Sequence, residues 1–388
     1  MIRNISVGID IGSANIRVVV AEFLKGENTP KVIGTGEAVS KGIRHGYIFK
    51  YEDALASIKK AIKQAEDISG VKIRRAFVSI GGITLSSEIN NGSSIISKAD
   101  NEVTNLDINK ALKECEDNLK LGNKRVIERF PIAFKLDEKE ILGRPEGMKG
   151  IKLDVKTFFI TCMSQHLDDL LAVVEEAGVE PIAPIASPIA ASNIALTEKQ
   201  KMVGCALVNI GSDTTSISVF ENGVPISMHI YSIGSSDITN DIALGLKIPL
   251  EEAESLKVDG HFGAYSKKKL DEIIEARFSD IFELIENHLK KIKRNGLLPA
   301  GVIFTGGGSA YPMLEHLSKE TLNLPTRIGG GEFFGNTKTK LRDSSWFVAL
   351  GLCLMSNDNP NGAPSGSFDT LVKGLKNSLK GIFKQLLP

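Results

Sequence analysis

The first apolar run of the chain is β-branched and ends at a polar turn. Its large side chains are Ile5, Val7, Ile9 and Ile11. A second apolar run, 18–20, follows this turn at once, and such a pair of runs is typical of two strands joined as a hairpin. The turn begins with Gly12 and Ser13, so its tip exposes backbone N–H groups, and such a nest binds anions.

The same pattern recurs in the second half of the chain. Residues 205–210 form an apolar run, a glycine-polar turn follows at 211–214, and a second run covers 215–220. A third glycine-rich turn, 306–308, lies between an expected strand and a helix expected to open near Tyr311. A single turn of this kind is an ordinary hairpin, whereas the ordered set of three is specific.

Helical periodicity separates these strands. Apolar residues recur at helical spacing in 51–67, and 270–294 has the pattern of a long amphipathic helix. Small residues fill the expected helix 187–196, which permits close backbone packing, and Gly234 opens another helix. The segment 83–164 combines short strands with one helix and carries no nucleotide motif, so we expect an inserted small α+β subdomain there.

The end of the chain changes in character. Residues 356–367 offer no apolar side chains of any size to bury, which predicts a flexible linker. Apolar residues then recur at helical spacing, at Phe368, Leu371, Val372, Leu375, Leu379, Ile382, Phe383 and Leu386. Lysines occupy positions between them, at Lys373, Lys376, Lys380 and Lys384. A terminal amphipathic helix often docks on its own domain, but the linker and the basic charge favour an anionic membrane surface, where each lysine contributes about 1 kcal/mol.

Composition sets wider limits. At 388 residues the chain exceeds what one core usually supports, so we expect two or more domains. The 47 basic and 47 acidic residues balance, which argues against a nucleic-acid binder. No apolar run approaches the roughly 20 residues that span a bilayer, and we expect no signal peptide before the first strand. The four cysteines lack metal-ligand spacing, which favours buried thiols in a reducing cytosol.

The ordered turns are similar to those of the actin, Hsp70 and sugar-kinase ATPase superfamily. This resemblance implies a two-lobed actin-like α/β fold, a duplicated ribonuclease-H-like arrangement with ATP in the cleft. With its inserted subdomain and basic tail, the chain resembles more specifically the FtsA family of bacterial actin-like cell-division proteins. The stretches that carry the resemblance are 8–20, 208–219, 232–246, 253–257, 304–308 and the tail.

The resemblance implies a division of the chain into six parts. These are a first actin-like subdomain (1–82 and 165–200), an inserted contact subdomain (83–164), a second actin-like subdomain (201–245 and 300–355), a helical partner-binding subdomain (246–299), the linker (356–367) and the membrane helix (368–388). It also implies filaments on the cytoplasmic face of the cell membrane at the division site, together with other division proteins. There the chain would anchor the FtsZ ring by binding the C-terminal peptide of this tubulin-like protein.

By the same resemblance, two turns cradle the phosphates of ATP. The first supplies Gly12, Ser13, Asn15 and Arg17, and the second supplies Gly211, Ser212, Asp213, Thr214 and Thr215. Asp10 would hold Mg²⁺ through water. The nucleotide would also contact Gly234, Glu254, Lys257, Gly306, Gly307 and Gly308. A solvated ion pair is the alternative reading of Glu254 and Lys257.

Three residues depart from the common family pattern and bear on hydrolysis. Asn209 and Ser216 stand at the ends of the second turn, where the family commonly has aspartate. Asn193 falls where relatives place a glutamate or glutamine that positions the attacking water, and an amide cannot act as a general base. Asp10 and the two asparagines are the candidate catalytic residues, and Asp213 would partly restore a carboxylate. The resulting hypothesis is tight ATP binding with very slow hydrolysis.

Other members of the superfamily fit less well. An Hsp70-type chaperone would need a substrate domain, and a sugar kinase would need a catalytic aspartate and a sugar pocket. The actin-like adaptor of type IV pilus assembly shares the fold and the insert but lacks a comparable membrane tail. A slow or nucleotide-free cytoskeletal scaffold that does not bind FtsZ is the third alternative.

Overall fold

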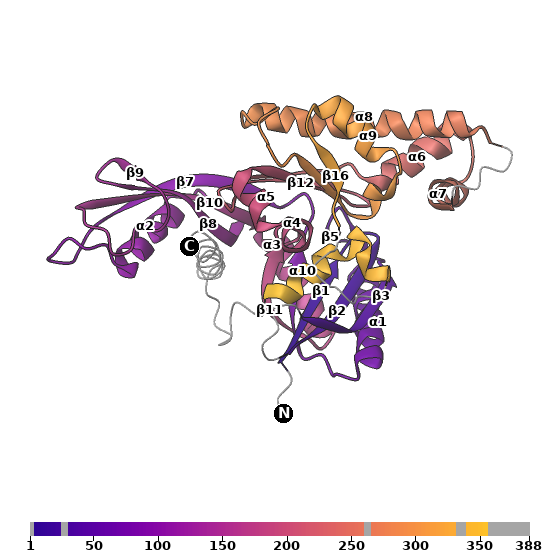
Figure 1. Ribbon diagram of the computed structural model, residues 1–388. Coiled ribbons are helices and arrows are strands. Elements are labelled where there is room, and N and C mark those ends of the chain that lie inside the picture. The colour runs from indigo at the N-terminus through magenta and orange to yellow at the C-terminus, as the bar shows by residue number, and fades with distance from the viewer. Residues whose placement is uncertain (1–3, 25–29, 260–264, 331–338, 356–388) are drawn as a thin grey trace, which may run out of the picture.

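The computed structural model describes residues 4–24, 30–259, 265–330 and 339–355 (Figure 1). The expected linker at 356–367 and the expected membrane helix at 368–388 lie outside these residues. The described chain forms two five-stranded sheets with their helices, and a smaller sheet projects to one side of them.

The first large sheet has the strand order β11-β6-β1-β2-β3. Its strands are β1 (Asn4–Ile11), β2 (Asn15–Phe23), β3 (Lys31–Val39), β6 (Arg75–Ile80) and β11 (Glu180–Ala186). Strands β1 to β3 are antiparallel, whereas β1, β6 and β11 run parallel. Helix α1 (Tyr51–Ser69) lies directly on β3, because Gly34 and Gly36 leave no side chain between the two backbones. The short strands β4 (Ile43–Arg44) and β5 (Tyr47–Ile48) precede α1.

The second large sheet repeats this order as β14-β13-β12-β15-β16. Its strands are β12 (Cys205–Ile210), β13 (Thr215–Glu221), β14 (Val224–Tyr231), β15 (Val302–Thr305) and β16 (Thr326–Ile328). Its helices are α6 (Ser235–Leu246), α7 (Leu250–Asp259), α8 (Lys267–Lys291) and α9 (Leu314–Leu322). Three antiparallel strands again precede the parallel ones. The repeated topology confirms the duplicated fold that the family resemblance implied.

The inserted subdomain is a four-stranded antiparallel sheet with one helix. Its elements are β7 (Ser86–Ile95), α2 (Asn105–Asp117), β8 (Lys124–Leu136), β9 (Lys139–Ile141) and β10 (Lys152–Met163), in the sheet order β7-β10-β8-β9. A separate core that includes Leu112, Val155 and Phe159 holds α2 on the sheet. The subdomain extends away from the two large sheets, and α3 (Ser164–Glu176) returns the chain to them (Figure 1).

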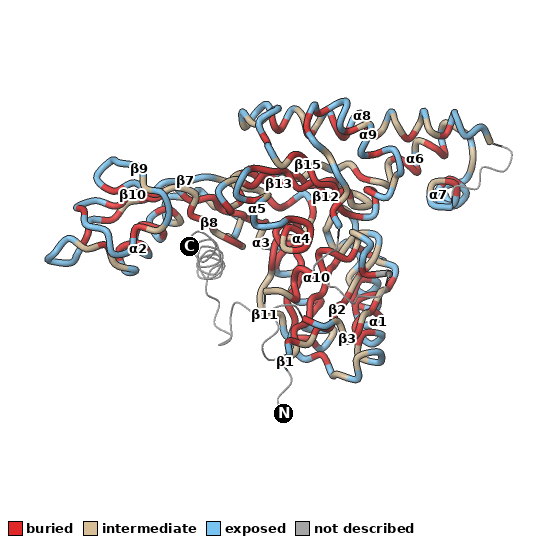
Figure 2. The backbone as a smooth tube through the Cα atoms, in the orientation of Figure 1, coloured by how far each residue is buried: buried red, intermediate tan, exposed pale blue. Residues whose placement is uncertain are grey.

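Two helices of mostly small or apolar residues lie at the centre of the molecule. These are α4 (Ser187–Ala195) and α10 (Phe347–Leu354), and both are deeply buried (Figure 2). A Cβ added at Gly351 of α10 would overlap the carbonyl oxygen of Ala190 in α4, and one added at Gly8 of β1 would overlap that of Ala349. The close backbone packing expected of the small-residue helix is therefore present. Helix α4 also contacts strands of the second sheet, including β12 and β13.

The remaining described elements are short. They are α5 (Glu198–Val203) and the 3₁₀ turns η1 (Gly307–Ala310), η2 (Thr339–Arg342) and η3 (Ser344–Trp346). All four cysteines are buried free thiols, as expected. Among the described helices, none is long and apolar enough to cross a membrane.

Candidate functional site

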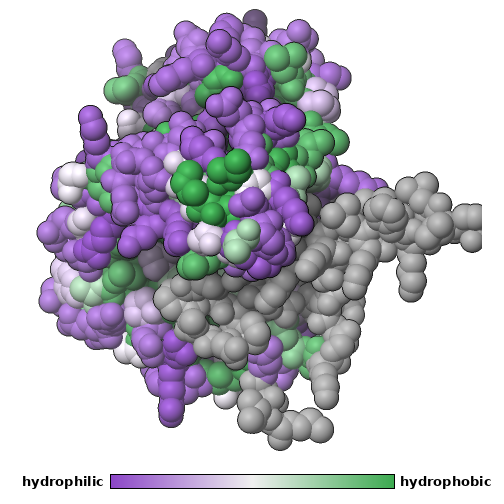
Figure 3. Space-filling view, turned by 90° about the vertical axis from the view of Figure 1, so that its left-hand side faces the viewer, coloured by the Kyte–Doolittle hydropathy of each residue, from purple (hydrophilic) through white to green (hydrophobic). Residues whose placement is uncertain are grey.

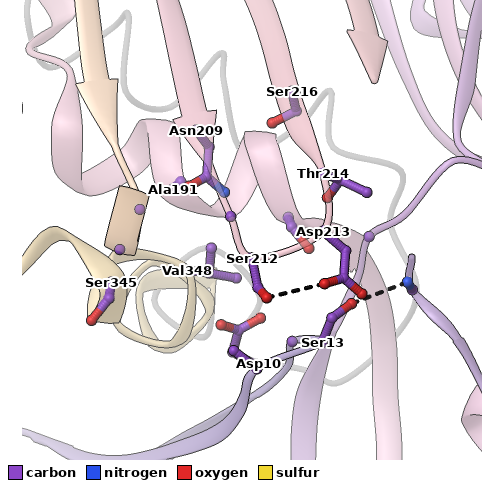
Figure 4. Close-up of a pocket in the computed structure, with 18 of the residues that line it drawn as sticks. Asp10, Ser13, Ala191, Asn209, Ser212, Asp213, Thr214, Ser216, Ser345 and Val348 are labelled. Carbon is purple, nitrogen blue, oxygen red and sulfur yellow. Dashed lines mark hydrogen bonds between the residues drawn. The ribbon is translucent and has the colours of Figure 1, made fainter. Parts of the chain in front are cut away.

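The two phosphate-type turns adopt the same backbone geometry. The N–H of Gly12 donates to the carbonyl oxygen of Asn15 at 3.2 Å, and the N–H of Gly211 donates to that of Thr214 at 2.8 Å. Each turn joins the first two strands of its own sheet. Both turns line one cavity of about 190 Å³, where the side chains of the two turns and of Asp10 approach one another (Figure 4).

Backbone donors at both turns are unused within the chain. Across the described ranges, no protein group accepts a hydrogen bond from the N–H of Ser13, Ala14, Ser212 or Asp213. Successive unpaired N–H groups at a turn form an anion-binding nest. The cavity therefore presents two such nests, one from each half of the molecule.

Asp10 is a buried carboxylate at the floor of this cavity, with 8% of its surface exposed. Its Oδ1 atom accepts a hydrogen bond from the Ser79 hydroxyl at 2.8 Å, and Ser79 in turn accepts from the N–H of Ile11. Burial raises the pKa of Asp10, while Ser79 and Arg17 oppose this shift more weakly. A cation bound beside Asp10 would supply a positive charge that stabilises the buried carboxylate in its ionised form.

The donor set fits a magnesium ion that keeps most of its water. Mg²⁺ is usually held by one or two carboxylates together with waters and phosphate oxygens. Asp10 can supply such an oxygen beside the two nests. The described part of the chain contains no group of three histidine, cysteine or acidic side chains that would form an all-protein cage.

Arg17 lines the cavity but is already engaged elsewhere. Its Nε atom lies 3.0 Å from an oxygen of Glu37, and its guanidinium lies 5.5 Å from the ring centre of Trp346. The expected contact between Arg17 and phosphate is thus limited to the two terminal nitrogens of the guanidinium.

Asp213 of the second turn is held by donors from three segments. Its carboxylate accepts hydrogen bonds from the Ser212 hydroxyl at 3.0 Å, the N–H of His45 at 3.1 Å and the Ser236 hydroxyl at 3.5 Å. The N–H of Gly46 donates to the Ser13 hydroxyl at 3.3 Å. Residues 45 and 46 therefore join the two turns.

The third glycine turn closes the cavity on another side. Gly306 and Gly307 line it, and Gly306 has a φ of 86°. A Cβ on Gly306 would overlap the side chain of Asn209, which also lines the cavity. Gly308 does not line it and instead packs against Ile210.

The start of α6 supports the second turn. The N–H groups of Ser235 and Ser236 donate to the carbonyl oxygens of Gly211 and Ser212, both at 2.9 Å. Gly234 allows this approach, because an added Cβ would overlap the Ser212 carbonyl. Thr215 lies behind the turn, where its hydroxyl donates to the carbonyl of Ile233.

The structure places six predicted site residues outside the cavity lining, namely Asn193, Thr215, Gly234, Glu254, Lys257 and Gly308. Glu254 and Lys257 form an ion pair of 2.7 Å, and the Lys257 ammonium also donates to the carbonyl of Ser235 at 3.1 Å. Asn193 lies beside Lys201 and Met355, at 3.5 and 3.7 Å from them. The remaining predicted residues of the two turns do line it.

Sequence reasoning missed several lining or supporting residues. They are Ser79, Gly46, Gly81, Gly82, Ser187, Ser235, Ser344 and Ser345. The Gly81-Gly82 pair after β6 is a signal that could have pointed to close backbone approach. The serines carry no distinguishing pattern in the sequence.

Two family models match the chain. The model described as "Cell division protein FtsA" matches residues 206–351, and the model described as "SHS2 domain inserted in FTSA" matches residues 82–161. The second match coincides with the projecting sheet.

Known structures of low sequence identity share the fold. The PilM-PilN type IV pilus biogenesis complex matches with a TM-score of 0.70 at 16% identity, over 90% of this chain and 98% of the other. MreB5 of Spiroplasma citri bound to ADP matches with a TM-score of 0.52 at 14% identity, over 92% and 98%. These likenesses concern the fold alone.

Sequence relatives extend over most of the chain. The cell division protein FtsA of Bacillus subtilis is 29% identical over 368 residues, which are 89% of this chain and 82% of the relative. That of Pseudomonas aeruginosa is 29% identical over 345 residues, which are 83% and 82%. With the duplicated sheets, the inserted SHS2 domain and these relatives together, the chain belongs to the FtsA family.

Proposed function

We propose that the chain is an ATP-binding, actin-like cell-division protein that polymerises on the cytoplasmic face of the membrane and anchors the FtsZ ring. The observation that carries this proposal is the pair of matching turns, 12–15 and 211–214, on either side of one cavity. The family relationship supports the cellular role, because the relatives are named cell division proteins over the matched length.

The charges around the cavity favour a nucleotide that is bound with magnesium. The charged side chains that line it are Asp10, Arg17 and Asp213 among the described residues. Two carboxylates beside a triphosphate would repel it, so the N–H nests alone would give weak binding. Mg²⁺ bound through water to Asp10 would neutralise part of the phosphate charge and hold the phosphate oxygens between the turns.

The residues that line this cavity also support the proposal that ATP is hydrolysed slowly. Both carboxylates that line it already accept hydrogen bonds from the protein, Asp10 from Ser79 and Asp213 from His45 and Ser212. Asn209 offers an amide, which cannot take a proton from water. The nucleotide would therefore act chiefly by setting the angle between the two halves, and a turnover as fast as that of an efficient kinase would contradict this proposal.

Exposed apolar side chains support protein contacts at two places. On the inserted subdomain they are Ile89, Ile95, Leu106, Leu142, Met148 and Ile151. On the helical region around α6 and α7 they are Leu244, Leu250 and Val258. Figure 3, which views the molecule from the side of the insert, shows hydrophobic residues among hydrophilic ones on this face. We propose that the insert contacts a second copy of the chain and that the helical region receives the FtsZ C-terminal peptide.

Nucleotide binding is tested by a thermal shift. ATP with Mg²⁺ at 100 times its dissociation constant should add about 2.7 kcal/mol to the free energy of unfolding. No shift with any nucleotide, together with no binding of a fluorescent ATP analogue, would leave a nucleotide-free scaffold as the better reading.

Membrane anchoring is tested by sedimentation with anionic vesicles. The full chain should sediment with them at low salt, and a chain lacking 368–388 should stay in the supernatant. Four lysines at about 1 kcal/mol each make the binding salt-sensitive. Equal sedimentation of both chains would favour an adaptor without a membrane tail.

A further inference from the structure

The segment 45–47, which we call the strap, touches both phosphate turns and both ends of the inserted subdomain. We propose that His45 and Gly46 of the strap respond to the separation of the two turns around the terminal phosphate, and that Tyr47 transmits this response to the insert. This inference rests on the proposed nucleotide site and goes beyond it, because it names the route by which the nucleotide would act on a distant contact surface.

On the phosphate side, the strap is bonded to both halves of the molecule. The N–H of His45 donates to Oδ2 of Asp213, and its Nδ1–H donates to the carbonyl oxygen of the same residue, both at 3.1 Å. The N–H of Gly46 donates to the Ser13 hydroxyl at 3.3 Å, and Gly46 lines the cavity. The strap therefore links the first turn to the second by hydrogen bonds alone.

On its other side, the strap packs against the start of the insert. The N–H of Ile83 donates to the carbonyl oxygen of His45 at 3.3 Å. Gly46 and Gly82 both have positive φ, 87° and 92°, and their backbones are in contact. A Cβ on Gly82 would overlap the His45 carbonyl, so no side chain can separate the strap from the entry to the insert.

Tyr47 brings the strap against the end of the insert. Its ring stacks on His166, with ring centres 5.0 Å apart and an angle of 26° between the planes. Its hydroxyl lies 3.7 Å from the sulfur of Met163, the last residue of β10. Burial lowers the pKa of His166, so the ring is neutral near pH 7 and the stack is apolar. A hydrogen bond between His166 and Thr84 ties the end of the insert to its beginning.

These contacts make the position of the strap depend on the separation of the turns. A phosphate held by N–H groups of both turns changes the distance between Ser13 and Asp213. The strap, bonded to both, must then shift or lose a bond. Because it also contacts the two segments by which the chain enters and leaves the insert, at 82–84 and 163–166, its shift biases the orientation of the insert.

The test is amide hydrogen exchange of the full chain without nucleotide, with ADP and Mg²⁺, and with a non-hydrolysable ATP analogue and Mg²⁺. Amide exchange at 82–86 and 162–166 should be slower by about fivefold or more in the protein bound to the ATP analogue than in the protein bound to ADP. Tyr47→Ala should abolish this difference while its affinity for the analogue stays within about threefold of wild type. Tyr47 is 36% exposed, which makes the substitution tolerable for folding.

Two matched variants control for loss of the tyrosine itself. Tyr47→Phe keeps the stacked ring and should keep the response. Tyr51→Phe removes a hydroxyl that contacts Glu176 away from the strap and should also keep it. If Tyr47→Ala unfolds at the assay temperature, Tyr47→Leu, which keeps apolar bulk without an aromatic ring, takes its place.

The outcomes separate this inference from the proposed function. Wild-type protein that binds no nucleotide overturns the proposed function and the inference together. Wild-type protein that binds the analogue without any change at 82–86 and 162–166 overturns the inference alone. An alanine variant that responds as wild type does shows that the strap is not the route.

Discussion

Gly306 lies so close to Asn209 that a single added carbon would overlap the asparagine side chain, although 97 positions separate them in the chain, as they separate the neighbouring Val208 and Thr305. The two residues bring the third glycine turn against the end of β12. Gly306 adopts a φ of 86°, which an L side chain rarely tolerates. Both the steric overlap with Asn209 and the positive φ therefore require glycine at position 306.

Gly306→Ala should lower the free energy of unfolding by about 2 kcal/mol or more, because positive φ and steric overlap add. The matched control is Gly307→Ala, since a Cβ there meets nothing within 4 Å. The control should stay within about 0.5 kcal/mol of wild type. Denaturant unfolding measures both, and equal losses would mean that the overlap at Gly306 is relieved by a shift of the turn.

Gly307→Ala should nevertheless weaken nucleotide binding. Gly307 lines the cavity, and its added Cβ would occupy space that we assign to the nucleotide. We expect a loss of about fivefold or more in affinity for ATP with Mg²⁺, that is about 1 kcal/mol, by fluorescence titration. An unchanged affinity would place the nucleotide away from this turn.

Asp10→Asn should weaken the binding of ATP with Mg²⁺ without lowering the stability of the ligand-free protein. The change removes a buried charge and keeps an acceptor for Ser79, so the melting temperature without ligand should hold or rise. Affinity for ATP with Mg²⁺ should fall by about tenfold or more. In EDTA the variant should bind ATP at least as tightly as wild type, because one carboxylate that repels the phosphates is gone. A loss of affinity that persists in EDTA would argue against a magnesium role for Asp10.

The buried side chain of Glu128 should make the free energy of unfolding fall as pH rises. This residue of β8 is buried, its Oε2 accepts from the N–H of Ala186, and its Oε1 has no partner among the described residues. Burial raises its pKa from 4.5 to about 8. Between these values the unfolded chain releases a proton that the folded chain retains, so stability from this group is full below pH 4.5 and falls as pH rises toward 8.

Glu128→Gln should remove this fall. At about 1.36 kcal/mol per pKa unit, the variant should be more stable than wild type by up to a few kcal/mol at pH 8 and nearly equal to it at pH 4.5. Glu140→Gln on the exposed strand β9 is the control and should not change the slope. Thermal unfolding across this range measures all three, and parallel curves for wild type and Glu128→Gln would contradict the prediction.

The turns and both sheets could be predicted because their signals are local. Apolar runs around Gly12 and Gly211 specify each hairpin, and the repeat specifies the duplicated fold. The third turn was predicted less well. A 3₁₀ turn closed by the Ser309 N–H on the Gly306 carbonyl comes first, so the helix begins at Leu314 and not near Tyr311.

The strap and the position of Asn193 could not be predicted because they depend on contacts between distant segments. No local pattern relates His45 to Asp213, which is 168 residues away. For Asn193 a resemblance in position suggested the cavity, but its amide lies beside Lys201 instead. At Glu254 and Lys257 the spacing of three was informative, and the ion pair that it allows is formed.

Helices α4 and α10 form one tightly packed pair through the backbone contact between Gly351 and Ala190. Helix α10 packs on β1, α4 contacts strands β12, β13 and β15 of the second sheet, and the chain passes from the first half to the second just after α4. A rigid helix pair beside this crossing leaves rotation about a single axis as the easy motion and opposes sliding. One angle would then describe how far the mouth of the cavity is open, and a bulkier residue at position 351 would disturb that axis without touching the ligand.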